Sequence, residues 1–174
     1  QALQDQMAQV QAVLHGLGYP GQHLTWLQAD SVDALDAQLK TLPAAPARPG
    51  PPAKFALTSD KRSSLALALD HWMSHAPAAQ AWPEAIALPT AGAFWGGVQV
   101  DAQACTLCLS CVSACPASAL QDNPDQPELA IIEKNCVQCG LCVTTCPENA
   151  IQTVPRLLLT PARHERQVLN QSQP

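Results

Sequence analysis

The N-terminal half of the chain places apolar residues at helical spacing. Residues 2–17 carry them three or four positions apart and are followed by a glycine, so they are predicted to form a helix: Leu3, Met7, Val10, Val13, Leu14 and Leu17. Asp30 or Ser31 can cap a second helix that ends near residue 42. A third helix is predicted from about residue 59 to about residue 75, and residues 23–28 are predicted to form a short strand.

Proline and glycine interrupt this helical pattern. Residues 43–52 read PAAPARPGPP, which is typical of a semi-extended linker. Residues 76–97 are also rich in these residues and are predicted to form an irregular connection that contains a strand at 85–88.

From residue 98 the pattern shifts toward strands. Residues 98–100 alternate between apolar and polar, and residues 150–154 are expected to pair with them as an antiparallel strand. Residues 129–132 form another predicted strand, preceded by a polar turn at 122–127.

Composition narrows the classes of function. The chain has 174 residues, of which 47% are hydrophobic and 13% charged, as in a globular protein. Its formal net charge of −5 argues against a nucleic-acid partner, because phosphate binding needs a basic surface. The sequence has no run of about 18 apolar residues, so no membrane span is expected. It also shows no basic start followed by an apolar stretch, so a cytoplasmic location is expected.

All eight cysteines lie between residues 105 and 146. They form two groups with the pattern C-x2-C-x2-C-x3-C-P, CTLCLSCVSACP at 105–116 and CVQCGLCVTTCP at 136–147. The second group repeats the first at an offset of 31 residues, and the likeness continues into the residues that follow each group. The segment is therefore a short internal duplication.

This spacing suits cubane iron–sulfur clusters. Two-residue gaps let a tightly wound loop present three thiolates from one side, and the fourth cysteine follows on a helical turn that points away, toward the other cluster. Two [4Fe–4S] clusters are therefore predicted. The first is held by Cys105, Cys108, Cys111 and Cys146, and the second by Cys136, Cys139, Cys142 and Cys115.

Zinc and disulfides explain the cysteines less well. Zinc sites usually separate two C-x2-C pairs by a dozen or more residues. Disulfides need Cα separations that cysteines only three positions apart meet poorly, and no secretory signal points to an oxidising compartment.

Residues 97–155 resemble the bacterial dicluster [4Fe–4S] ferredoxins, with cysteine at all eight ligand positions. The resemblance implies an α+β fold with β-α-β-β-α-β order. The expected domains are a mainly helical region at 1–96, a ferredoxin domain at 97–155 and a C-terminal tail at 156–174. The residues expected to shield the clusters from water are Leu109, Val112, Ile131, Leu141, Val143 and Ile151.

The resemblance implies electron transfer at low potential and not catalysis, because four thiolates on each cluster leave no iron open to a substrate. The long N-terminal region favours a subunit or module that serves a larger oxidoreductase or redox partner protein. An acidic surface on residues 98–154 would steer the encounter with a basic partner. The alternative is a regulatory or structural iron–sulfur protein.

Other residues are assigned to packing or to the solvated surface. His71 and His75 are spaced like a metal pair, but the acid of the H-E-x-x-H pattern is absent, so they are interpreted as a solvated or capping pair. Trp95 is interpreted as a packing residue, with shielding of a cluster edge as the alternative. The tail arginines are expected on a solvated face, with docking to a partner as the alternative: Arg156, Arg163 and Arg166.

Overall fold

A computed structural model of the protein describes residues 1–43, 51–56, 60–77 and 83–172. The chain divides into two compact units, residues 1–82 and 83–174, and each is described by itself. The division falls earlier than the expected boundary at 96/97, because a strand at Ala85–Ala87 pairs within the second unit. Most of the predicted linker at 43–52 lies outside the described residues.

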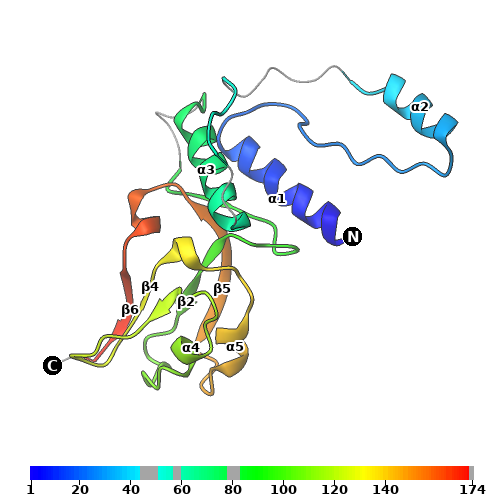
Figure 1. Ribbon diagram of the computed structural model, residues 1–174. Coiled ribbons are helices and arrows are strands. Elements are labelled where there is room, and N and C mark those ends of the chain that lie inside the picture. The colour runs from blue at the N-terminus through cyan, green and yellow to red at the C-terminus, as the bar shows by residue number, and fades with distance from the viewer. Residues whose placement is uncertain (44–50, 57–59, 78–82, 173–174) are drawn as a thin grey trace. The chain divides into compact units, whose positions relative to one another are not determined.

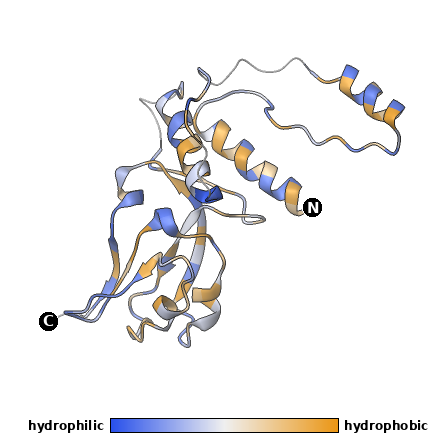
Figure 2. Ribbon diagram, in the orientation of Figure 1, coloured by the Kyte–Doolittle hydropathy of each residue, from blue (hydrophilic) through white to orange (hydrophobic). Residues whose placement is uncertain are grey.

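The described residues of the first unit form three helices, as predicted (Figure 1): α1 at Ala2–Gly16, α2 at Val32–Lys40 and α3 at Lys61–Ser74. The hydroxyl of Ser31 accepts the backbone N–H of Ala34 and caps α2, and the carboxylate of Asp60 caps α3 in the same way. In α2 no residue is buried, and Figure 2 shows hydrophobic and hydrophilic residues mixed along it.

The prediction of a strand at residues 23–28 is wrong. The segment is extended but pairs with no other strand among the described residues. Its first two backbone N–H groups donate instead to the side-chain oxygen of Gln11, at 2.9 Å from His23 and 3.3 Å from Leu24. The segment is therefore held by a side chain of α1 and not by a sheet.

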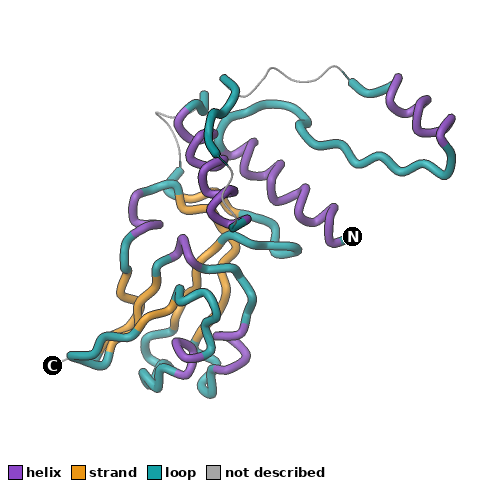
Figure 3. The backbone as a smooth tube through the Cα atoms, in the orientation of Figure 1, coloured by secondary structure: helices purple, strands orange, loops and turns teal. Residues whose placement is uncertain are grey.

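The second unit combines short helices with two antiparallel sheets (Figures 1 and 3). One sheet has the order β1-β5-β2, from strands at Ala85–Ala87, Ile151–Leu158 and Gly96–Val100. The other has the order β3-β4-β6, from strands at Leu120–Gln121, Glu128–Ile131 and Gln167–Gln171. The helices are α4 at Ser110–Ser113 and α5 at Leu141–Thr145, with 3-10 turns η1 at Glu133–Asn135 and η2 at Pro161–His164. The class is α+β, as expected.

The expected pairing of 98–100 with 150–154 is confirmed by β2 and β5, where Val98 lies opposite Thr153. Residues at 156–174 were expected as a tail, but most of them are structured. β5 runs on to Leu158 and β6 pairs with β4, so this segment completes both sheets.

Arg166 lies on the exposed surface as expected, but Arg156 is only partly exposed, and all three tail arginines make contacts within the unit. Arg156 pairs with Glu133, and Arg166 pairs with Glu128 and donates to the carbonyl of Asp122 at 3.1 Å. Arg163 is itself buried. Arg166 holds the pKa of the Glu128 carboxyl below its usual value, with help from the side chains of Gln126 and Asn123.

The internal duplication is visible in the backbone. α4 and α5 begin 31 residues apart, and so do β3 and β5. Positive φ angles occur in pairs at the same offset: Leu107 and Gln138, Leu109 and Gly140, and Ser118 and Asn149. Because L-residues other than glycine rarely adopt this conformation, its recurrence marks two copies of one loop structure.

Apolar residues from both sheets form one core in this unit. Ile131 and Ile151 belong to it, and Leu109, Val112 and Val143 pack against it. Leu141, expected among the shielding residues, is instead 45% exposed at the start of α5. No helix among the described residues combines the length and apolar character needed to cross a membrane.

Candidate metal centre

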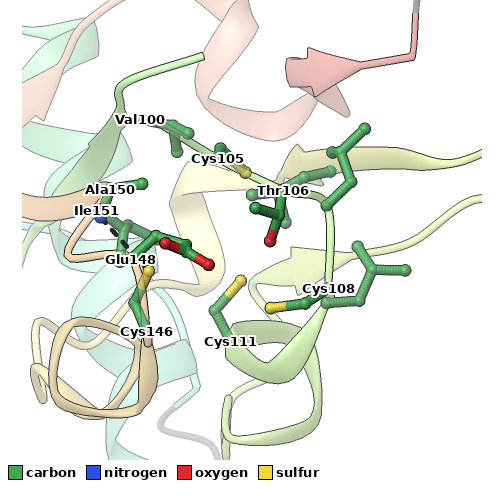
Figure 4. Close-up of a pocket in the computed structure, with 12 residues that line it drawn as sticks. Val100, Cys105, Thr106, Cys108, Cys111, Cys146, Glu148, Ala150 and Ile151 are labelled. Atoms are coloured by element: carbon green, nitrogen blue, oxygen red, sulfur yellow. Dashed lines mark hydrogen bonds between the residues drawn. The ribbon is translucent and has the colours of Figure 1, made fainter. Parts of the chain in front are cut away.

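Four cysteines converge on a first pocket of about 370 Å³. Cys105 and Cys108 come from the loop that leads into α4, Cys111 lies in α4 itself, and Cys146 follows the end of α5. Figure 4 shows their four sulfur atoms turned toward one space, with Val100 and Ile151 beside it.

The other four cysteines line a second pocket, also of about 370 Å³. Cys136 and Cys139 come from the loop into α5, Cys142 lies in α5 itself, and Cys115 follows the end of α4. The last cysteine of each motif thus faces the pocket of the other motif. The structure therefore brings together the same two sets of four that the spacing predicts.

The ends of the two short helices set up this exchange. α4 and α5 contact each other, and each ends just before its crossing cysteine. The backbone N–H of Ala119 donates to the sulfur of Cys115 at 3.3 Å, and that of Ala150 donates to the sulfur of Cys146 at 3.4 Å. These two bonds are equivalent in the repeat, and N–H donors of this kind stabilise a thiolate more than a thiol.

The chemistry of the cysteines fits a cationic, thiolate-bound group. All eight are free, with no disulfide among them. Burial raises the pKa of the Cys111 thiol to about 11, and it also raises the pKa values of Cys136 and Cys142. These thiols keep their protons at neutral pH unless a metal displaces them, because a coordinating metal deprotonates a thiol outright. Soft thiolate sets select iron–sulfur clusters, zinc or copper(I).

The arrangement of the sulfur atoms favours a cluster over a single ion. Over the described ranges, no three His, Cys, Asp or Glu side chains gather closely enough to bind one ion. The four sulfurs instead surround each pocket. A cubane fits this pattern because each of its thiolates binds a different iron atom, so the sulfurs stay well apart.

An ion pair with a buried carboxylate joins η1 to strand β5. The Glu133 carboxylate, with 4% of its side chain exposed, accepts from Arg156 Nη2 at 2.6 Å and from Arg156 Nε at 3.1 Å. A Cβ atom on Gly97 would lie 2.5 Å from Glu133 Oε2, so a side chain here would displace the carboxylate. The pair therefore links η1 to β5 directly over strand β2.

We expect the Arg156→Ala substitution to lower the free energy of unfolding by about 2–3 kcal/mol, because it leaves the Glu133 carboxylate buried without its partner. Denaturant unfolding of the anaerobic protein measures the loss. Arg156→Lys is the matched control, because it keeps the positive charge but loses the bidentate hydrogen bonds to the carboxylate. We expect it to lower the free energy of unfolding by less than the alanine substitution does. Equal stability of the wild type and the alanine variant would contradict this role.

Sequence reasoning missed Gln138 and Glu133, and it assigned Arg156 to a solvated face. Gln138 Nε2 donates to the Gly97 carbonyl at 2.8 Å and to the Cys136 sulfur at 3.2 Å. Its partner Gly97 lies 41 positions away along the chain. The cysteine pattern contains no signal for contacts of this separation; the consecutive glycines Gly96 and Gly97 were the only visible hint of a close approach.

Two other candidates are not among the residues that line the pockets. Trp95 is buried, with 8% exposure, but it does not line either pocket. The rings of His71 and His75 lie 4.4 Å apart, and each ring bonds a backbone carbonyl, that of Pro51 for His71 and that of His71 for His75. The interpretation of this pair as a capping feature near a helix end is consistent with those bonds.

The comparisons with known proteins agree with the geometry of the cysteines. None of the curated proteins compared with the chain matches it. Residues 104–151 match the family model of the 4Fe-4S dicluster domain, and this range contains all eight cysteines. The match supports the binding of iron–sulfur clusters by this part of the chain.

Proposed function

We propose that the chain is an electron-transfer protein that carries two [4Fe–4S] clusters and serves a larger oxidoreductase as a subunit or module. Cys105, Cys108, Cys111 and Cys146 hold the first cluster. The second is held by Cys136, Cys139, Cys142 and Cys115. The observation that carries the proposal is the crossed set of four cysteines at each pocket.

The finer family assignment belongs to this proposal. The second unit runs β2-α4-β3-β4-α5-β5 in chain order, which supports a bacterial-type ferredoxin domain with β-α-β-β-α-β order. The remaining strands, β1 and β6, extend the two sheets at their edges.

A [4Fe–4S] cluster supplies reversible one-electron chemistry when bound. The residues of the chain hold it, exclude water and stabilise its charge. The third cysteine of each motif, Cys111 and Cys142, is buried, whereas the second, Cys108 and Cys139, is exposed. The two exposed cysteines are therefore the parts of the sites that come nearest to a redox partner.

Four thiolates at each site leave no metal position open to a substrate, so the chain has no catalytic site of its own in this proposal. Its partner is a redox protein with a basic docking surface, because a net charge of −5 attracts positive charge. The same negative charge disfavours a nucleic acid as the partner. A cytoplasmic location suits ligands that must stay reduced.

The rival function is a regulatory or structural iron–sulfur protein. A reductive titration under anaerobic conditions separates the two. An electron carrier takes up about two electrons per chain and returns them on reoxidation with its visible spectrum restored, since each [4Fe–4S] cluster accepts one. Irreversible bleaching, or no uptake at all, would favour the rival.

A further inference from the structure

The side-chain amide of Gln138 joins strand β2 to the second pocket. Its nitrogen donates one hydrogen to the Gly97 carbonyl at 2.8 Å and one to the Cys136 sulfur at 3.2 Å. An amide nitrogen carries two hydrogens, so the two bonds use both of them. The carbonyl of Gly97 accepts only, which fixes the orientation of the amide and keeps an N–H on the sulfur.

This placement is unfavourable in itself. Gln138 Oε1 is buried and has no hydrogen-bond partner, and a buried unsatisfied acceptor costs about 1–3 kcal/mol. The residue also has a φ of 54°, a conformation that side-chain-bearing residues rarely adopt. Unsatisfied buried groups and unfavourable backbone conformations are often found at functional positions, so we expect the Gln138 amide to have a role other than stabilising the fold.

The equivalent position of the first cysteine motif carries no such donor. The residue that corresponds to Gln138 in the repeat is Leu107, which has a φ of 58° and lines the first pocket. The two loops therefore share a backbone conformation and differ in the side chain. Only the second pocket receives a hydrogen bond from this position.

A negative charge also distinguishes the two pockets, and its effect on reduction is opposite to that of the hydrogen-bond donor. Glu148 lines the first pocket, and Figure 4 shows its carboxylate turned toward the space between the cysteines. Its counterpart in the repeat is Ala117, which lines the second pocket. Adding an electron makes a site more negative, so a nearby carboxylate disfavours reduction and a hydrogen-bond donor favours it.

Hydroxyl contacts at Cys108 in the first pocket act the other way, because they favour a negative charge on its sulfur. Ser110 Oγ lies 3.5 Å from the Cys108 sulfur and lowers the pKa of that thiol, and the Thr106 side chain contributes in the same direction. Cys108 is exposed, so water can take the place of the hydroxyl when it is removed. The contact of Gln138 with Cys136 is partly buried, and water replaces it less readily. The amide is therefore the stronger of the two influences.

We propose that Gln138 makes the Cys136 pocket the higher-potential of the two sites, so that the first electron added to the protein resides there. The proposal rests on the proposed function, since it requires a cluster in each pocket. Gln138 acts through Cys136 and is a positioning residue: it stabilises the extra negative charge that reduction places on the thiolate. Any one-electron reductant, such as dithionite, supplies the electron.

The test is Gln138→Leu, which installs the residue found at position 107. Leucine already holds this backbone conformation there, so folding and cluster binding are expected to survive. In a potentiometric titration followed by EPR, the equilibrium constant for reduction of the higher-potential cluster should fall about tenfold, a shift of 59 mV for a one-electron couple. The lower potential should stay unchanged, and the two values should converge.

Two further measurements separate this role from a structural one. Ser110→Ala should leave both potentials unchanged. In resonance Raman spectra, the iron–thiolate stretching bands of the wild type should shift in D₂O, and Gln138→Leu should lose part of that shift, because the exchangeable N–H on Cys136 is gone.

The proposal is overturned if Gln138→Leu changes neither potential, or if it changes the lower one. Iron analysis of the same samples keeps this result distinct from the proposed function. If the protein contains about eight irons per chain and Gln138→Leu leaves both potentials unchanged, only the role of Gln138 is rejected. If the wild type contains about four irons per chain, the two-cluster function itself is rejected.

Discussion

Replacing Cys115 with alanine should damage the cluster of the Cys136 pocket, although Cys115 lies in the first cysteine motif. The structure places Cys115 in the pocket lined by Cys136, Cys139 and Cys142. Loss of one of four thiolates removes an iron ligand from that site and leaves the other site complete. Iron content should fall from about eight per chain toward about four.

Alkylation under anaerobic conditions followed by mass spectrometry locates the damage. In Cys115→Ala, the cysteines of the second motif should become reactive while those of the first pocket stay protected. Cys146→Ala is the matched control and should show the reverse pattern. If Cys115→Ala instead exposed Cys105, Cys108 and Cys111, the crossed arrangement would be wrong.

Removal of iron should unfold the cysteine-bearing part of the second unit. Among the described residues, its core cluster has eight buried residues, and two of these are Cys111 and Cys142. Cys111 lines the first pocket and Cys142 lines the second, so a group bound in each pocket would contact this core. Metal–thiolate bonds in structural sites supply on the order of 10 kcal/mol, which is as large as the whole stability of a typical domain.

Hydrogen exchange followed by mass spectrometry, before and after treatment with a chelator, measures this effect. Backbone amides of β2, β4 and β5 should lose their protection. Helix α1 belongs to the other unit and serves as the internal control, so its exchange should change little. Equal protection of the sheets with and without iron would show that the fold does not depend on the clusters.

The cysteine sites were predictable because their information is local. Eight cysteines at fixed short intervals predict two sets of four, and the structure places the same two sets around its two pockets. The helices were predictable for the same reason, since a cap such as Asp60 and the apolar spacing of α1 act within a few residues.

The features that sequence reasoning missed depend on partners far apart in the chain. Strand β6 exists because it pairs with β4, and Arg156 is ordered because it meets Glu133. Conversely, residues 23–28 have the composition of a strand but find no strand to pair with among the described residues. β-structure reflects its neighbours more than its own sequence, so errors of both kinds are expected there.

The central claim is that the chain binds two [4Fe–4S] clusters through its eight cysteines. Iron and acid-labile sulfide analysis of anaerobically purified protein tests it most directly. The account predicts about eight irons and about eight sulfides per chain. Four or fewer irons, or zinc in their place, would contradict it.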